Sequence, residues 1–234
     1  ILRVHEIMRE EGKFLPVIAK IEKPQAVANL EEIIDAFDGV MVARGDLGVE
    51  LPLEQVPIVQ KRAVELARRW AKPVIVATQM PESMITASRP TRAETSDVAN
   101  AVLDGADALM LSGETSVGQF PIETIETMAK IIESTEENGL ERIPALGTQP
   151  HTHSGAVVKS ALQIAELVGS KFVCVFTESG DTLLRVARLR SRVPVLAFTP
   201  NEEIRRRLSL IWGATTFLAG KATHTDQMIK QVDE

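Results

Sequence analysis

Three charged side chains follow two apolar stretches of the sequence. Lys20 and Glu22 come at the end of the stretch 17–22, and Asp46 comes shortly after the apolar run 39–43. Side chains two positions apart on a strand share a face, so Lys20 and Glu22 are expected to point the same way. If the next strand brings Asp46 beside them, Glu22 and Asp46 would bind a hard divalent cation through oxygen. Lys20 would then face negative charge that develops on a substrate.

Apolar periodicity predicts the elements that position these side chains. Strands are expected near 16–21, 39–44, 73–78 and 107–111, each followed by apolar residues at helical spacing, as in 24–37. Helix starts are marked by Pro24, by Pro121 and by the capping box from Thr91 to Glu94. Alternating strands and helices predict a parallel sheet. In a (β/α) barrel, the chemistry lies just after such strands.

Further residues that could do chemistry fall at or just after the ends of the predicted strands. They are Arg44, Gly45, Thr78, Ser112 and Glu114. The sequence contains four strand–helix units in this part, whereas a closed barrel needs eight. It therefore predicts either half of a barrel or an open sheet with a different burial scheme.

The segment 143–150 carries two prolines and little periodicity, which predicts a boundary between a domain 1–142 and a domain 143–234. Beyond the boundary, strands are expected at 171–176, 194–198 and 214–218. Helices are expected at about 154–169, 181–191 and 201–212, and from about 224 onward. The second domain is thus predicted to be a smaller α/β unit.

Composition excludes several classes of protein. A net charge of −6 argues against nucleic-acid binding, which needs a cationic face. No apolar run approaches the roughly 20 residues that span a bilayer, and no signal peptide opens the sequence. The single cysteine, Cys174, excludes a disulfide within the chain. These features predict a soluble, cytoplasmic protein with neither a nucleic-acid nor a membrane partner.

Six motifs in order resemble those of pyruvate kinases. They are AKIE (19–22), MVARGDLGVE (41–50), ATQM (77–80), RPTRAE (89–94), DVANAV (97–102) and MLSGET (110–115). The resemblance runs from the first residue to the last, but it covers only the second half of that family's barrel and most of its C-terminal domain. It implies the second half of a TIM (β/α)8 barrel, followed by a three-layer α/β domain that regulates and oligomerises and is truncated at its end.

The resemblance also implies an activity, which is transfer of the phosphoryl group of phosphoenolpyruvate to ADP with Mg²⁺ and usually K⁺. Protonation of the enolate then gives pyruvate. Glu22 and Asp46 would be the Mg²⁺ ligands, and Lys20 would stabilise charge on the phosphoryl group and the enolate. The ligands for K⁺ are expected outside this chain. The family further implies a glycolytic homotetramer.

Supporting roles follow from the same resemblance. Backbone N–H groups around Gly45 and Asp46 would take the substrate carboxylate, while Arg44 would position this segment. Thr78 would offer a hydroxyl to the carboxylate or to a proton-donating water. A supporting hydrogen-bond shell would come from Ser112 and Glu114.

In the second domain, the loop 177–182 is where that family binds sugar-phosphate effectors. A phosphate could be held at this helix start by Thr177, Ser179, Gly180 and Thr182. The carboxylates of Glu178 and Asp181 would repel it, and Asp181 has the alternative role of capping the helix. Binding of a sugar-phosphate or nucleotide effector therefore stays open.

Two other functions remain as alternatives. A Mg²⁺-dependent barrel lyase would release pyruvate from a larger acid without ADP, so dependence on ADP separates it from a kinase. A non-enzymatic module would bind phosphate ligands and oligomerise. The 234 residues alone are expected to be inactive, because the groups that bind ADP and K⁺ would lie in the absent half of the barrel.

Overall fold

The computed structural model describes residues 1–233. The chain divides into two compact units, Ile1–Pro144 and Ala145–Glu234. None of the described helices is both long and apolar enough to cross a membrane.

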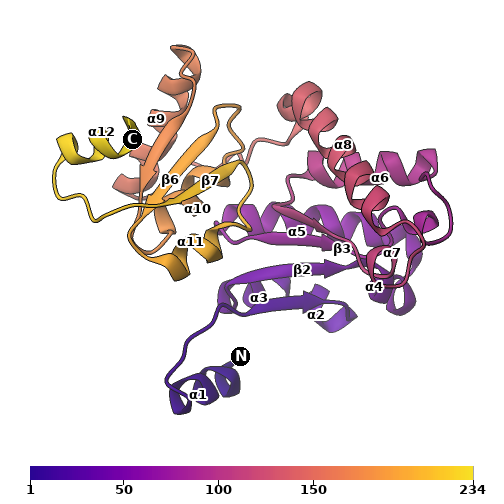
Figure 1. The fold of residues 1–234 in the computed structure, drawn as a ribbon. Coiled ribbons are helices and arrows are strands. Elements are labelled where there is room, and N and C mark those ends of the chain that lie inside the picture. The colour runs from indigo at the N-terminus through magenta and orange to yellow at the C-terminus, as the bar shows by residue number, and fades with distance from the viewer. Residues whose placement is uncertain (234) are drawn as a thin grey trace. The chain divides into compact units, whose positions relative to one another are not determined.

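The first unit is built on a four-stranded parallel sheet (Figure 1). Its strands are β1 (Ile18–Ile21), β2 (Gly39–Ala43), β3 (Val74–Ala77) and β4 (Ala108–Met110), and they pair in the order β1-β2-β3-β4. The register aligns Ile21 with Val42, Val42 with Val76, and Val76 with Leu109. Four strands predicted from periodicity are thus confirmed, and their carboxyl ends lie at one edge of the sheet.

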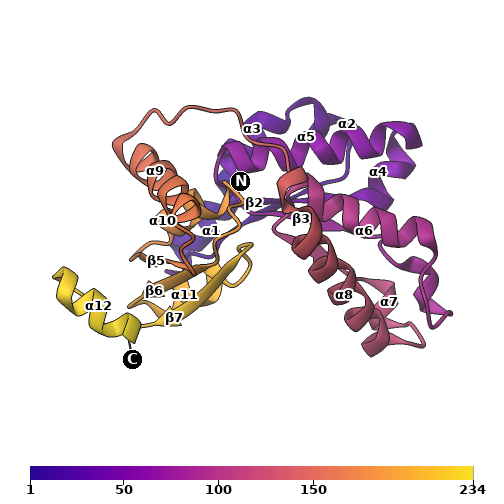
Figure 2. The same ribbon diagram turned by 90° about the horizontal axis from the view of Figure 1, so that it is seen from above.

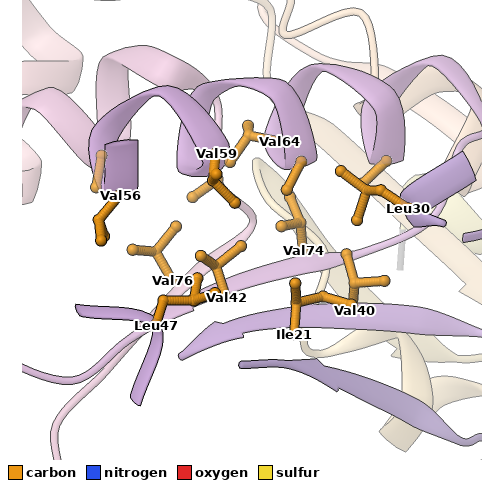
Figure 3. Packing of buried hydrophobic residues seen from close by; sticks show 14 of the residues in the cluster. Ile21, Leu30, Val40, Val42, Leu47, Val56, Val59, Val64, Val74 and Val76 are labelled. Atoms are coloured by element: carbon orange, nitrogen blue, oxygen red, sulfur yellow. The ribbon is translucent and has the colours of Figure 1, made fainter. Parts of the chain in front are cut away.

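Helices cover one face of this sheet. Aligned strand side chains such as Ile21, Val42 and Val76 pack with helix residues such as Leu30 and Val64 in one core cluster (Figure 3). A fully buried side chain of this size contributes about 1.5–3 kcal/mol. The helices of the first unit are α1 (Leu2–Glu10), which buries no residue, α2 (Pro24–Ala28), α3 (Leu30–Ala36), α4 (Arg44–Glu50), α5 (Val56–Arg69), α6 (Arg92–Asp104), α7 (Gly113–Ser116) and α8 (Pro121–Gly139), with short 3₁₀ turns η1 (Leu53–Gln55), η2 (Glu82–Ile85) and η3 (Leu140–Arg142).

Local signals explain where several helices begin. Pro24 and Pro121 occupy first-turn positions of α2 and α8. At the start of α6, the Glu94 N–H donates to Thr91 Oγ1, and the Thr91 N–H donates to the Glu94 carboxylate, which confirms the predicted capping box. Helix α6 then packs against α8 (Figure 2).

Two helical predictions need correction. The helix expected over 24–37 is interrupted at Asn29, whose side chain donates a 2.8 Å hydrogen bond to the carbonyl of Gln25 and so competes with the helix backbone. Arg44, expected at the end of the strand 39–44, instead begins α4, whose first turn also contains Asp46.

The second unit carries a three-stranded parallel sheet of β5 (Val173–Phe176), β6 (Val195–Thr199) and β7 (Ala214–Leu218). Its helices are α9 (His153–Leu167), α10 (Asp181–Ala187), α11 (Glu202–Leu208) and α12 (Thr225–Asp233). One face of the sheet packs Val175 and Ala197 against Leu183 and Leu208. On the other face, three aligned phenylalanine rings stack across the strands. The ring centroids are 4.9 Å apart for Phe176 and Phe198 and 5.2 Å apart for Phe198 and Phe217.

Two helices of this unit are shorter than predicted. Helix α10 ends at Ala187 rather than near 191, because Arg190 takes a positive φ of 55° and donates to the carbonyl of Ala187. Helix α11 ends at Leu208 rather than 212, where the Ser209 hydroxyl donates to the carbonyl of Arg206.

Candidate active site

Lys20, Glu22 and Asp46 meet near the carboxyl ends of β1 and β2. Lys20 Nζ lies 2.5 Å from Glu22 Oε2 and 2.8 Å from Asp46 Oδ2. Exposed and buried side chains alternate along β1, which puts Lys20 on the face opposite the helix-covered core. Asp46 projects from the first turn of α4, directly after β2. The structure thus brings the three predicted side chains into one cluster.

The two carboxylates stabilise the charged form of Lys20. Its hydrogen bond to Asp46, and then that to Glu22, raise the pKa of the ammonium above its usual range. The contact with Lys20 in turn lowers the pKa of Asp46. Half of the Lys20 side chain is exposed, so these ion pairs add little to folding stability. Their consequence is a fixed geometry of opposite charges at the sheet edge.

The carboxylates of Glu22 and Asp46 fit a hard divalent cation. Both reach the same ammonium within 2.8 Å, so their oxygens converge on one point. Mg²⁺ is commonly bound by one or two carboxylates, with water and substrate oxygens filling its remaining positions. In the described residues, no group of three or more His, Cys, Asp or Glu side chains is placed to hold a metal ion. A site here would therefore use two protein carboxylates and leave room for substrate.

Arg44 is buried, with 8% of its surface exposed, and links two neighbouring strand ends. Its guanidinium donates to the carbonyl of Thr78 at 3.0 Å and to that of Gln79 at 2.7 Å. On its other side, Arg44 pairs with Asp97 of α6 at 2.6 Å and donates to Gln60 Oε1 of α5 at 3.3 Å. Arg44 therefore holds the segment after β3, whereas the role expected for it was to position its own segment around Gly45 and Asp46.

The segment after β3 has an unusual backbone. Thr78 and Gln79 both take positive φ angles, 68° and 52°. This conformation is rare for a β-branched residue and costs on the order of 1–3 kcal/mol. The hydrogen bonds from Arg44 to both carbonyls offset that strain. They also turn the Thr78 hydroxyl toward α4, where Thr78 Oγ1 accepts from the Gly45 N–H at 2.8 Å.

Gly45 approaches this segment closely. A Cβ atom at its position would lie 3.3 Å from Thr78 Oγ1, which is a tight contact. Its N–H, expected to bind a substrate carboxylate, is directed at Thr78 in this structure. Gly45 and Thr78 are thus brought together, and Asp46 connects them to the Lys20 cluster.

Ser112 and Glu114 lie elsewhere on the sheet edge. They follow β4, three strand spacings from β1, or on the order of 14 Å. The Ser112 N–H donates to Glu114 Oε2 at 2.8 Å. Glu114 is 2% exposed, and its Oε1 has no hydrogen-bond partner among the described residues. The pair therefore forms a second polar group rather than a part of the Lys20 cluster.

Comparison with known proteins places this chain in a family. The pyruvate kinase barrel domain family matches residues 1–125, and the pyruvate kinase alpha/beta domain family matches residues 155–234. The chain belongs to the pyruvate kinase family. Its sequence is 60% identical to the pyruvate kinase of Corynebacterium glutamicum, over 98% of this chain and 48% of that protein. It is 58% identical to the pyruvate kinase of Mycobacterium tuberculosis, over 99% of this chain and 49% of that protein.

The fold agrees with a solved pyruvate kinase. The crystal structure of a pyruvate kinase from Cryptosporidium parvum superposes with a TM-score of 0.88 at 36% identity, over 94% of this chain and 46% of that one. The predicted fold class, a pyruvate kinase barrel segment followed by an α/β domain, is confirmed. The chain spans about half the length of the curated pyruvate kinases it matches.

Sequence reasoning gave no role to two residues of this site. Asp97 belongs to one of the family motifs and is the carboxylate partner of Arg44. Gln60 sits in the middle of α5, is 2% exposed and also contacts Arg44. A polar residue on the apolar face of a helix was the available signal for Gln60, because a buried amide needs hydrogen-bond partners.

In the loop 177–182, which follows β5, several polar groups form hydrogen bonds within the loop itself. Thr177 Oγ1 accepts from the Gly180 N–H at 2.9 Å, and Ser179 Oγ accepts from the Asp181 N–H. Asp181 does not cap α10, which begins after Gly180, but pairs with Arg185 at 2.7 Å. Thr182 follows in the first turn of this helix. Glu178 pairs with Lys221 at 2.8 Å, beside a cavity of about 130 Å³ lined partly by Phe176, Phe198 and Met228.

Proposed function

We propose that this chain supplies the metal- and enolate-binding half of a pyruvate kinase active site. The complete protein would transfer the phosphoryl group of phosphoenolpyruvate to ADP, giving pyruvate and ATP. The observation that supports this most directly is the Lys20 ammonium, which lies within 2.8 Å of both Glu22 and Asp46. One cation and two carboxylates at a strand edge suit a substrate that is bound as an anion together with a metal ion.

In this proposal, Glu22 and Asp46 hold Mg²⁺, which supplies Lewis-acid polarisation of substrate oxygens when bound. Lys20 leaves its carboxylate partners and turns its three N–H donors to the transferring phosphoryl group and the enolate oxygen. A lysine ammonium is ordinarily protonated across the physiological range, so Lys20 acts as a positive charge and not as a base.

Other residues bind and orient the substrate. The N–H groups of Gly45 and Asp46 lie in the first turn of α4, where free helix N–H groups suit a carboxylate. Because the Gly45 N–H is held by Thr78, the two would rearrange together when substrate binds. Thr78 would then turn its hydroxyl to the substrate carboxylate or to a water that protonates the enolate. Arg44 would keep the segment in place during this exchange.

The second polar group would support that protonation. Glu114 is buried with one carboxylate oxygen unpartnered in the described residues, and it fixes the Ser112 backbone through the other. Such a pair is suited to ordering water beside the site. This assignment rests on the likeness to the family and on the burial of Glu114.

The wider assignments are also part of the proposal. The domain 1–142 would be catalytic, and 143–234 would regulate and oligomerise within a cytoplasmic, glycolytic homotetramer. K⁺ would be bound by residues outside this chain. The 234 residues alone would not turn over, because four strands cannot enclose a barrel site.

Effector binding at the loop 177–182 is a separate part of the proposal. The cavity beside it, with Lys221 at its wall, could accept the phosphate of a sugar or nucleotide. Glu178 already neutralises Lys221, and the hydroxyls of Thr177 and Ser179 accept hydrogen bonds from their own loop. An effector would have to break these contacts. Calorimetry with sugar phosphates tests this, since Ser179→Ala with Thr182→Ala should abolish the heat seen with the parent.

The main proposal is tested in the full-length polypeptide that carries this sequence. Formation of pyruvate from phosphoenolpyruvate should require both ADP and Mg²⁺. Lys20→Met should lower kcat by at least about a hundredfold while Mg²⁺ binding persists, because removing one preorganised electrostatic group costs about 10²–10³ in rate. Release of pyruvate from a larger acid without ADP would instead establish the lyase alternative. If neither reaction is detected, the remaining alternative is a non-enzymatic module that binds phosphate ligands.

A further inference from the structure

Arg44 depends on a buried amide that none of the roles above uses. Gln60 lies on α5 with 2% of its surface exposed. Its Oε1 accepts from Arg44 Nη1 at 3.3 Å, and its Nε2 donates to Asp104 Oδ2 at 2.9 Å. The guanidinium can only donate and the carboxylate can only accept, so these two neighbours fix which way the amide points. Gln60 therefore joins Arg44 to the C-terminal end of α6.

Asp104, at the far end of this series of contacts, is held in place by its own neighbours. The side chain of Asp104 is 8% exposed, and its other oxygen is paired with Lys61. Lys61 also donates to Asn100 Oδ1 at 3.0 Å. One carboxylate oxygen of Asp104 thus pairs with the Lys61 ammonium and the other accepts from Gln60. These two contacts fix the orientation of the Asp104 carboxylate. The position of Gln60 is consequently set from the α5–α6 side and not by the loop that Arg44 holds.

The near end of the chain of contacts is the strained segment after β3. Arg44 Nη2 lies 3.0 Å from the Thr78 carbonyl and 2.7 Å from the Gln79 carbonyl, both belonging to residues with positive φ. Asp97 and Gln60 both accept hydrogen bonds from the same guanidinium nitrogen, Nη1. The opposite edge of the guanidinium therefore donates to these two carbonyls. A guanidinium is planar, so fixing Nη1 orients the whole fork.

We propose that Gln60 is a positioning residue of this site: with Asp97 it orients the guanidinium of Arg44, which in turn holds Thr78 and Gln79 in the conformation that brings the Thr78 hydroxyl to the Gly45 N–H. The inference rests on the proposed function where catalysis is concerned. The geometric part concerns only this chain and has its own readout.

Reversing the polarity of the contact between Gln60 and Asp104 tests this role. Gln60→Glu keeps the shape of the side chain but places a carboxylate 2.9 Å from that of Asp104, where two like charges repel. Adding Asp104→Asn restores complementarity, because the new amide can donate to position 60 while still accepting from Lys61. Recovery in the double variant shows that residues 60 and 104 are coupled. A purely structural role predicts that this coupling changes only the stability of the protein, whereas a positioning role predicts that it also changes the contact between Gly45 and Thr78.

The first measurement is hydrogen exchange at the Gly45 amide, which reports the contact with Thr78 without any need for activity. Exchange should accelerate by about tenfold or more in Gln60→Glu and return to within about threefold of the parent in the double variant. Glu65→Gln, which changes an exposed residue of the same helix, is the control and should leave exchange unchanged. Parental exchange in Gln60→Glu, or no recovery in the double variant, would overturn the inference.

The second measurement is steady-state kinetics of the full-length polypeptide with phosphoenolpyruvate, ADP and Mg²⁺. In Gln60→Glu, kcat/KM should fall by about tenfold or more, and the double variant should recover most of it. An inactive parent would refute the proposed function but leave the exchange result to decide the geometry. An active parent with an unaffected Gln60→Glu variant would refute the positioning role alone.

Discussion

The N–H of Gly45 donates a 2.8 Å hydrogen bond to the hydroxyl of Thr78, which joins the residues that follow two neighbouring strands. The same hydroxyl donates to the carbonyl of Ala77 at 2.6 Å. Because Thr78 lies at a positive φ, this contact depends on a backbone conformation that the residue would not adopt by itself. The pair therefore reports whether the sheet edge is correctly assembled.

Replacing Thr78→Val should lower the free energy of unfolding by about 1–2 kcal/mol. Valine has nearly the same shape but offers no acceptor, so the partly buried Gly45 N–H loses its partner. Thr78→Ser keeps the hydroxyl and should stay close to the parent. Urea unfolding of the three proteins measures the difference, and equal stability of the valine and serine variants would show that the contact contributes nothing.

Asp46→Asn should weaken Mg²⁺ binding by at least about tenfold, or about 1.4 kcal/mol, because one of two charged ligands is lost. Isothermal titration calorimetry with Mg²⁺ measures the affinity directly. Asp35→Asn makes the same chemical change at an exposed position of α3 and serves as the control. Identical affinity in the parent and in Asp46→Asn would remove Asp46 from the metal site.

Glu202 should titrate near pH 2. Its hydrogen bonds from Arg205, and then from Arg206, lower the pKa of this carboxyl from 4.5 to about 2. A depressed folded-state pKa contributes stability that is present above the unfolded value and is lost as the pH falls toward the folded one. The difference in free energy of unfolding between the parent and Glu202→Gln should therefore have its full value above about pH 5 and shrink between pH 4.5 and 2.

NMR titration of the Glu202 side chain gives its midpoint, and unfolding curves at several pH values give the stability difference. Glu203→Gln removes the same charge one position along α11 and is the matched control. A midpoint near 4.5 would show that the arginine contacts do not persist in solution.

Gly118→Ala should destabilise the first unit by about 1–3 kcal/mol or more, which is the range for overpacking. A Cβ atom at this position would lie 2.2 Å from the carbonyl oxygen of Glu114, which belongs to the backbone of α7 and cannot rotate away. Gly113→Ala, in α7 itself, would bring a Cβ atom no closer than 3.4 Å to Ile85, which is an ordinary contact, and should be close to neutral. Thermal unfolding of both variants tests this, and parental stability of Gly118→Ala would contradict the packing.

Much of the fold follows from local patterns in the sequence. Of the seven strands in the part of the chain that the structure describes, six lie within the expected ranges and β6 extends one residue further, to Thr199, because short apolar runs between polar turns specify buried strands strongly. The capping box at Thr91 formed as predicted, since it needs only residues three positions apart in the chain. Lys20, Glu22 and Asp46 came together for a similar reason, as parallel strands of matched register carry their following residues to one edge.

What could not be predicted depends on contacts between distant segments. The burial of Arg44 is decided by carbonyls 34 and 35 positions away and by side chains on α5 and α6. No local pattern in the sequence predicts that Thr78, a β-branched residue, takes a positive φ. The break at Asn29 shows the converse case, in which a side-chain hydrogen bond outweighs an apolar periodicity that favours one continuous helix.

The strands of the first sheet lie in the order in which they occur in the chain. Each strand from β2 to β4 pairs with the one that precedes it, across a helical connection. A ribosome releases the polypeptide from its N-terminus, so every new strand emerges when the edge it joins already exists. This sheet can therefore grow one strand at a time during synthesis, without waiting for a later segment to insert between strands that have already paired.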